Sequence, residues 1–300
     1  MYLVVGATGM VGGAVCARLA AAGRPVRALV RASSDPAKVQ RLREAGVETV
    51  VGDLREPGSL DAACVGIDAV VATVSAMPFS YAAGVNDIET TDRQGMLELV
   101  RAAAGAGVRH FSYLSFSGNL DRDFPLRNAK REVEGALARS GIEHTILRPS
   151  CFMEVWLGPA VGFDPANGAA TIYGSGEAPI SWIATSDVAA FAVASLTHPA
   201  ARNAILELGG PRPIPPLEAV RIFETAFGRP IAVSHVPVEA LDAQVAAAVD
   251  PMQRSFAGLM RCCADGDAIE MGSTSGLLDE PLTTVEAFAG QVAAAAATPV

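Results

Sequence analysis

Three glycines stand close to the start of the chain, in the run Gly6-Ala7-Thr8-Gly9-Met10-Val11-Gly12. The run follows a strand-like segment and opens a helix-like one. Gly6 allows a tight turn, Gly9 lets the backbone approach a pyrophosphate, and Gly12 lets helix and strand pack closely. Unpaired N–H groups at the start of the helix then attract the diphosphate. The spacing predicts a dinucleotide site, with a glycine-rich turn lacking any ligand as the alternative. Its expected residues are Gly6, Thr8, Gly9, Met10, Val11 and Gly12.

Arg31 ends the second strand-like segment and is expected to select the dinucleotide. Folds that bind NAD usually have a carboxylate here, which accepts from the ribose 2′-hydroxyl and would repel a 2′-phosphate. This chain has no acidic residue until Asp35, whereas Ser33 and Ser34 lie close by. A guanidinium binds a phosphate through two parallel hydrogen bonds. The residues therefore favour NADP(H), and a solvated surface arginine is the alternative.

Two further strand ends carry candidate cofactor contacts. Asp53 follows the third strand, where its carboxylate would accept from the adenine amino group while Leu54 packs on the ring. A helix-capping aspartate is the alternative interpretation of Asp53. Thr73, Val74 and Ser75 end the fourth strand and are expected to pass beneath the ribose of the cofactor.

The elements that must position these residues alternate regularly over the first 150 residues. Short runs rich in Val and Ile predict strands at 2–5, 26–30, 47–51, 69–74, 110–114 and 144–147. Amphipathic segments predict helices at 10–22, 35–45, 88–104 and 126–140. Several strands are apolar on both faces, as in parallel strands covered by helices on both sides. The pattern predicts an α/β fold with a doubly wound parallel sheet.

The pattern becomes less regular after Pro149. Residues 158–181 look loop-like, with a short strand at 170–173, and Thr185, Ser186 and Asp187 are expected to cap a helix that ends near 196. Helix–strand units near 215–227 and 231–236 precede two or three helices, and 293–297 is expected to be a frayed helix end or a disordered tail. We expect a Rossmann domain over 1–150 with about 183–196, and a smaller C-terminal α+β lobe within 151–300 that binds substrate.

Composition excludes several classes of protein. The 300 residues carry a net charge of −9 without any Lys/Arg-rich run, which argues against direct nucleic-acid binding. No apolar stretch approaches the roughly 18 residues of a membrane span, and no signal peptide precedes the first strand. Five cysteines without C-x-x-C spacing and four unclustered histidines predict a soluble cytoplasmic protein without a metal. The vicinal pair Cys262-Cys263 is interpreted as buried apolar side chains, with a redox-active pair as the alternative.

Taken together, these motifs resemble the NmrA-like group of atypical short-chain dehydrogenases/reductases. The resemblance covers residues 1 to about 195 and is poor over the last hundred. The other segments that carry it are Val30-Arg31, Gly52-Asp53-Leu54, Asn128 to Glu134, Thr145 to Pro149 with Phe152-Met153-Glu154, and Trp182 to Ala189. It implies a Rossmann domain that binds NADP(H) and a small lobe that closes over the nicotinamide. The group includes quinone, azo and isoflavone-type reductases and also transcriptional co-regulators without known chemistry.

The resemblance also implies roles near the nicotinamide. Pro149 and Cys151 should approach that end of the cofactor, and Ser115 matches a serine of the wider superfamily. The superfamily uses Tyr-x-x-x-Lys, in which the tyrosine transfers a proton and the lysine holds the ribose hydroxyls. Lys130 is present, but Leu126 replaces the tyrosine. Alcohol–ketone interconversion and sugar-nucleotide epimerisation are therefore disfavoured.

Three explanations of the missing tyrosine remain open. Hydride passes to an acceptor that needs little acid help, such as a quinone, an azo bond or a conjugated enone. In the second explanation, another residue serves as the acid. Lys130 is the best candidate, followed by Tyr81, Tyr173 and Tyr113, and Tyr113 is expected to lie in the core. The third explanation is that the protein binds the dinucleotide without turning it over. For Lys130 we expect ribose contact, and a plain exposed helix lysine is the alternative.

The expected substrate wall is apolar and has few basic groups, which suits a neutral aromatic or polyketide-like molecule. The expected wall residues are Cys151, Phe152, Met153, Trp156, Phe163 and Trp182. The alternative is that about half of these side chains belong to the hydrophobic core. Glu154 is interpreted as a solvated glutamate, with a polar anchor as the alternative. The sequence thus predicts an NADPH-dependent oxidoreductase acting on a small, apolar, conjugated acceptor. The alternative is a non-catalytic NADP(H)-sensing regulator that acts through a protein partner.

Overall fold

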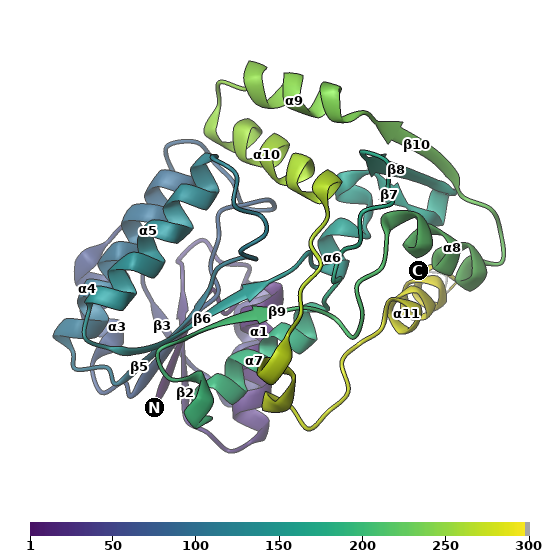
Figure 1. Cartoon of the computed structure of the whole chain (residues 1–300). Helices are drawn as coiled ribbons and strands as arrows, with labels where there is room; N and C mark the ends of the chain where they lie inside the picture. Colours follow the sequence, from purple (N-terminus) through teal and green to yellow (C-terminus); the bar gives the residue numbers. More distant parts are fainter. Residues whose placement is uncertain (298–300) are drawn as a thin grey trace.

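A parallel sheet of seven strands forms the centre of the larger lobe in this computed structural model, which describes residues 1–297 (Figure 1). The strands lie in the order β3-β2-β1-β4-β5-β6-β9. Their bounds are β1 Tyr2–Val5, β2 Val26–Val30, β3 Glu48–Val51, β4 Ala69–Ala72, β5 His110–Leu114, β6 Glu143–Pro149 and β9 Ala204–Leu208. Because the order runs outward in both directions from β1 and β4, the site at their carboxyl ends lies where the winding reverses.

Helices cover both faces of this sheet, as the sequence predicts. One face packs against α1 (Met10–Ala21), α2 (Pro36–Glu44) and α7 (Thr185–Ser195), and the other against α3 (Pro57–Cys64), α4 (Met96–Gly105) and α5 (Pro125–Arg139). In β1, Val4 enters the first core while Leu3 and Val5 enter the second, and all three side chains are buried. This two-sided burial explains the continuously apolar strands and confirms the doubly wound parallel sheet.

Three elements of this lobe differ from the sequence prediction. Strand β9 pairs with β6 from far along the chain, and the eight-residue α3 is too short to give a clear helical period. The segment expected as one helix over 88–104 begins as a π-helix, η1 (Ile88–Gly95), and continues as α4. π-Helical turns are uncommon and often occur at functional sites. The boundary between the lobes stays a prediction.

The smaller lobe contains a three-stranded sheet of order β10-β8-β7. Residues 158–181, expected to be mostly loop, hold β7 and β8 with two 3₁₀ helices. Residues 293–297 belong to the last helix, α11. The bounds are α6 Met153–Trp156, η2 Pro159–Val161, β7 Phe163–Asp164, η3 Pro165–Asn167, β8 Ala169–Tyr173, η4 Pro199–Ala201, α8 Pro216–Phe227, β10 Ala232–Val236, α9 Val238–Ala247, α10 Pro251–Asp265, η5 Gly272–Leu277 and α11 Val285–Ala297. No helix within residues 1–297 is long and apolar enough to cross a membrane.

The start of α7 corrects two predictions. The residue before the helix is Ala184, so Thr185 and its neighbours lie inside the first turn rather than at the N-cap. Glu154 takes over the capping role: its carboxylate accepts from the Thr185 N–H at 2.9 Å and from the Thr185 hydroxyl at 2.7 Å. Glu154 thus links α6 to α7 and is not a solvated glutamate, and its role as a polar anchor for substrate stays a prediction.

The two lobes meet along α5 and at the end of β5. The Ser255 hydroxyl of α10 accepts from the Leu126 N–H at 3.1 Å. Further along, the buried Asp267 carboxylate accepts from the Ser117 hydroxyl at 2.6 Å and from the Asn119 amide at 3.0 Å. These contacts hold the C-terminal part of the chain over the carboxyl edge of the large sheet.

Candidate dinucleotide and substrate site

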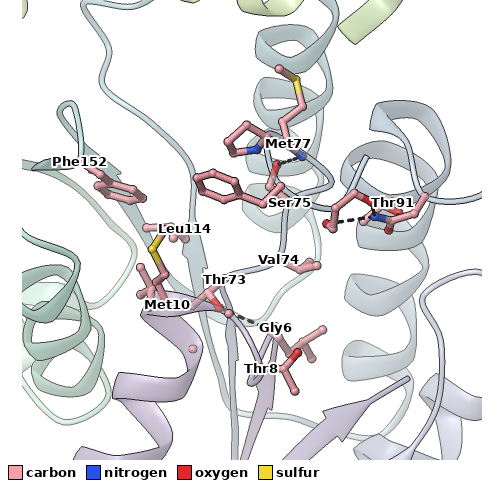
Figure 2. Close-up of a pocket in the computed structure, with 18 of the residues that line it drawn as sticks. Gly6, Thr8, Met10, Thr73, Val74, Ser75, Met77, Thr91, Leu114 and Phe152 are labelled. Carbon is pink, nitrogen blue, oxygen red and sulfur yellow. Dashed lines mark hydrogen bonds between the residues drawn. The ribbon is translucent and has the colours of Figure 1, made fainter. Parts of the chain in front are cut away.

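A cavity of about 580 Å³ runs along the carboxyl ends of the central strands. In Figure 2, Gly6 and Thr8 lie at one end and Phe152 at the other, with Met10, Thr73 and Leu114 between them. The residues that the sequence singled out come from six strand ends and two helices, and all line this cavity. They are Gly6, Thr8, Gly9, Met10, Val11, Gly12, Arg31, Asp53, Leu54, Thr73, Val74, Ser75, Ser115, Lys130, Pro149 and Cys151. Their individual roles stay predictions.

The glycine turn has the geometry of an anion cradle. Gly6 has a φ of +91°, which side chains disfavour, and a Cβ on Gly12 would lie 2.2 Å from the Gly6 carbonyl oxygen. Gly9 precedes α1 and offers no side chain to cap it. The first N–H groups of the helix therefore remain available to an anionic ligand at its positive end.

The Arg31 end of the cavity carries two cationic side chains, Arg31 and Lys38, together with the carboxylates of Asp35 and Asp53. Within residues 1–297 the half-buried Arg31 guanidinium makes no hydrogen bond or ion pair, while its backbone N–H donates to the Ser34 hydroxyl at 3.0 Å. Lys38, which the sequence analysis overlooked, also lines this end. The sequence feature that points to Lys38 is its position as a basic residue in the first turn of the helix that begins shortly after Arg31. Asp35 caps that helix by accepting from the Ala37 N–H.

The Asp53 carboxylate is already engaged within the chain. Arg55 donates to it from Nε at 2.9 Å and from Nη2 at 2.7 Å, and this hydrogen bonding lowers the pKa of Asp53. The residue that precedes α3 is Glu56, so the helix-capping interpretation of Asp53 is wrong. Contact with an adenine amino group stays a prediction for Asp53.

Lys130 lies inside the protein rather than on an exposed helix surface. Its side chain is only 6% exposed, and its ammonium donates to the Leu114 carbonyl oxygen at 3.1 Å. Asp92 Oδ1 lies 3.9 Å from the same nitrogen. Burial lowers the pKa of Lys130, while the negative charge of Asp92 opposes that shift.

Asp92 is a functional candidate that sequence analysis missed. It comes from η1, is fully buried, and accepts from the Ala76 N–H at 3.0 Å through Oδ2. Burial raises its pKa, and Lys130 opposes that shift most strongly. The sequence does contain a feature that points to Asp92. Asp92 precedes the buried Met96 by four residues, and this spacing places a charge on an apolar helix face.

The tyrosines that the sequence offers as proton donors, Tyr81, Tyr113 and Tyr173, are not among the residues that line the cavity. Tyr113 is fully buried, as expected, and its hydroxyl has no hydrogen-bond partner among residues 1–297. Burial raises its pKa well above the usual value. Tyr173 donates to the Val161 carbonyl oxygen at 2.8 Å, and neither it nor Tyr81 lines the cavity. Lys130 and Ser115 remain as donors near the apolar end.

Ser115 is held by a chain of ion pairs behind the cavity. Its hydroxyl accepts from Arg131 at 3.1 Å, and Arg131 pairs with Glu134 at 2.6 Å. Glu134 also pairs with Arg148 at 2.5 Å. Burial raises the pKa of Glu134, but hydrogen bonds and the two arginines outweigh this effect and lower it overall. The network fixes the orientation of Ser115 beside Lys130.

The apolar end contains half of the expected substrate wall. Cys151, Phe152 and Trp156 line the cavity, whereas Met153, Phe163 and Trp182 are buried in the core of the smaller lobe. The five cysteines are free and buried, which confirms the interpretation of Cys262 and Cys263. Cys151 Sγ lies 3.4 Å from Cys263 Sγ, and both side chains belong to the core of the smaller lobe. Residues 1–297 contain no group of His, Cys, Asp and Glu suited to a metal ion.

A glycine cradle at the switch point of a doubly wound sheet, open to a cationic and an apolar end, defines a Rossmann protein of the dinucleotide-binding class. Comparison with family models makes the assignment specific. The model of the NmrA-like family matches residues 2–289, and the chain belongs to this family.

Named relatives fall into two groups. An NAD(P)H azoreductase from Xenophilus azovorans is 33% identical over 241 residues, covering 80% of this chain and 78% of its own. The photosystem II assembly factor Ycf39 of Synechocystis is 30% identical, covering 80% and 71% respectively. Among solved structures, an NADPH-dependent quinone oxidoreductase from Escherichia coli in complex with NADPH has a TM-score of 0.78 at 21% identity, covering 97% of this chain and 99% of its own.

Proposed function

We propose that this chain is an NADPH-dependent oxidoreductase that transfers hydride to a small, apolar, conjugated acceptor of the quinone, azo or enone type. The observation that carries the proposal is the continuous cavity, cationic at Arg31 and Lys38 and apolar at Phe152. The azoreductase relative supports the same reaction class. Delocalised acceptors suit a site in which Leu126 stands where the superfamily has its tyrosine.

The residues present fit an NADP(H) cofactor. The N–H groups that follow Gly9 would bind the diphosphate, and the Arg31 guanidinium with Lys38 would bind the 2′-phosphate. Thr73 and Val74 would lie under the ribose. The quinone oxidoreductase structure with bound NADPH supports this assignment.

When bound, NADPH supplies the hydride. The chain then has to orient the acceptor, exclude water and stabilise negative charge. Phe152 and Trp156 provide apolar contact for an aromatic acceptor, and Pro149 and Cys151 wall the same end. The Lys130 ammonium, held by Leu114 and Asp92, supplies positive charge and a proton close to that wall.

Turnover and cofactor choice test the proposal together. Purified protein should oxidise NADPH in the presence of quinones, azo dyes or enones, with NADH run in parallel. Arg31→Ala should raise KM for NADPH about tenfold or more and leave that for NADH nearly unchanged, because only the 2′-phosphate is lost as a partner. Arg24→Ala, at an exposed arginine outside the cavity, is the matched control. Equal losses with both cofactors would refute the 2′-phosphate assignment.

The second candidate is a regulator that binds NADP(H) and acts through a protein partner. Two observations favour it: the Ycf39 relatives are named assembly factors, and no tyrosine among residues 1–297 lines the cavity. Tight NADPH binding without turnover across the panel would select this function. The cytoplasmic localisation stays a prediction.

A further inference from the structure

A second groove of about 650 Å³ lies beside the candidate site. Its walls come from the loop after β4, from η2, from α9, and from residues 252–260 of α10. The lining is apolar, with Met252, Phe256 and Met260 on α10, and it contains no charged side chain. Gln244 and Gln253 are its polar residues. A ligand of this groove is therefore uncharged and mainly hydrocarbon.

The groove shares part of its wall with the candidate site. Pro78 and Phe79 line both cavities. On α10, Leu259 lines the site and the next residue, Met260, lines the groove. Trp156 at the end of α6 lines the site, and Ala160 and Val161 in the following η2 line the groove. One molecule that lies against Phe79 thus contacts both cavities.

Phe79 marks the passage between them. Its side chain is 63% exposed, although large aromatic side chains usually bury most of their surface. An occupant that crosses from the site to the groove would cover this ring. A dinucleotide that extends from Arg31 to Cys151 already takes up the length of the first cavity, so a larger acceptor must place its remaining part elsewhere.

We propose that the hydride acceptor is an elongated molecule, with its conjugated ring beside Phe152 and an uncharged hydrocarbon tail in this groove. The inference rests on the proposed reductase function and adds the class of substrate to it. Each fully buried methylene group strengthens binding about fourfold. Because the groove is open on one side, a tail of ten carbons is expected to lower KM by roughly tenfold to a hundredfold.

A quinone series with tails of zero, five and ten carbons tests this in the wild-type protein and two variants. Ala247→Trp and Gln244→Trp place an indole on the face of α9 that lines the groove, from exposed positions. Ala246→Trp is the matched control, since Ala246 is exposed on the same helix and does not line the groove. In the wild type and the control, KM should fall as the tail grows longer. In both groove variants, KM should no longer depend on tail length. For the tail-less quinone, KM should be the same in all four proteins.

A second measurement separates this inference from the reductase proposal. Calorimetry measures binding of a dimethoxybenzene that carries a decyl tail, which hydride does not reduce. Tail-dependent binding without quinone turnover would support the groove and contradict the reductase function. Turnover with a KM independent of tail length would overturn the groove. A change of oligomeric state in Ala247→Trp, without any effect on tailed ligands, would also overturn it by assigning the groove to a second copy of the chain.

Discussion

Lys130 and Asp92 form the most unusual pair of residues in the site. Both are buried, and each loses solvation that would stabilise its charge. Their ammonium and carboxylate are 3.9 Å apart, and Asp92 Oδ1 has no hydrogen-bond partner among residues 1–297. Such groups are typical of functional sites, where a ligand completes the contacts. We interpret Asp92 as a positioning residue that keeps Lys130 charged.

The pair predicts a shift in the pH profile. If the protonated Lys130 supports turnover, activity falls as pH rises through a pKa that burial sets below the usual 10.5. Asp92→Asn removes the negative charge that raises this pKa, so the alkaline limb of kcat should move to lower pH. The measurement is kcat against pH for the wild type and the variant. Asp61→Asn is the control, because Asp61 is exposed on α3 and its charge does not shift the pKa of Lys130. An unmoved limb would contradict the positioning role of Asp92.

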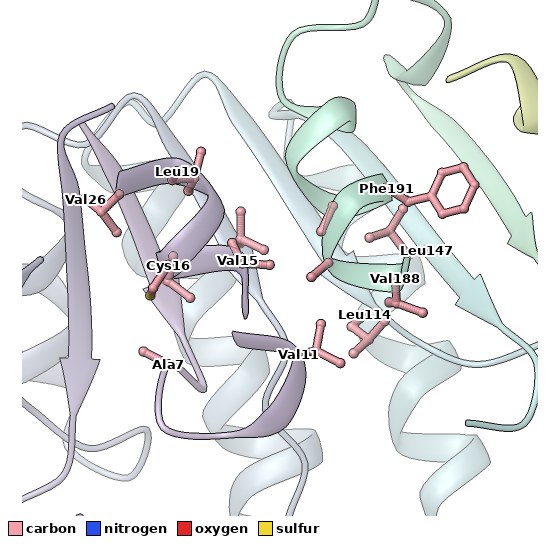
Figure 3. Close-up of a cluster of buried hydrophobic side chains, with 14 of the residues drawn as sticks. Ala7, Val11, Val15, Cys16, Leu19, Val26, Leu114, Leu147, Val188 and Phe191 are labelled. Carbon is pink, nitrogen blue, oxygen red and sulfur yellow. The ribbon is translucent and has the colours of Figure 1, made fainter. Parts of the chain in front are cut away.

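Helix α7 is the element that most depends on contacts distant in sequence. Figure 3 shows Val188 and Phe191 of α7 beside Leu114, at the end of β5, and Leu147, within β6. Phe191 is fully buried in this core. Apolar packing therefore holds the helix against the sheet, while its first turn takes its cap from another element.

The cap that Glu154 provides leads to a prediction about the stability of α7. Glu154→Ala leaves the Thr185 N–H and hydroxyl without their acceptor at the positive end of α7. We expect the free energy of unfolding to fall by about 1 kcal/mol, as for other lost caps. Urea denaturation measures it, and Glu177→Ala, at an exposed glutamate, is the control. Equal stability of both variants would argue against the cap.

The whole molecule depends on how the C-terminal residues return to the large sheet. Asp267 accepts from Ser117 and Asn119 at the end of β5, and its N–H donates to the Pro179 carbonyl oxygen at 2.9 Å. The Ser255 hydroxyl of α10 accepts from the Leu126 N–H of α5 across the same boundary. These contacts fix α10 against α5 and so shape the apolar end of the cavity (Figure 1).

Removing the Asp267 carboxylate should weaken the packing of the C-terminal part of the chain against the large lobe. Asp267→Ala deprives two donors of a buried acceptor, and we expect unfolding free energy to fall by about 2 kcal/mol. The variant should also become sensitive to protease in the C-terminal part before the large lobe unfolds. Limited proteolysis and urea denaturation measure both effects. Asp279→Ala, at an exposed aspartate, should behave like the wild type; a stable, protease-resistant Asp267→Ala would contradict the contact's role.

Elements with a strong local signal were predictable. Strands β1, β2 and β5 have the expected bounds, and α1, α2 and α5 differ from expectation by one or two residues. Strand β9 was missed because Ile205 and Glu207 lie on the outward face of a sheet edge, which leaves a weak apolar pattern. Glu154 was misinterpreted because its partner, Thr185, is distant in sequence.

The sequence by itself determined the glycine turn, the cation at Arg31, the doubly wound sheet and the loss of the tyrosine at Leu126. All of these follow from short-range spacing, which a single segment carries on its own. Only the tertiary structure decided that Asp92 faces Lys130, that Cys151 meets Cys263 and that a groove continues from the site at Phe79. These relations depend on how distant segments pack, and burial and charge pairing are properties of that packing rather than of local pattern.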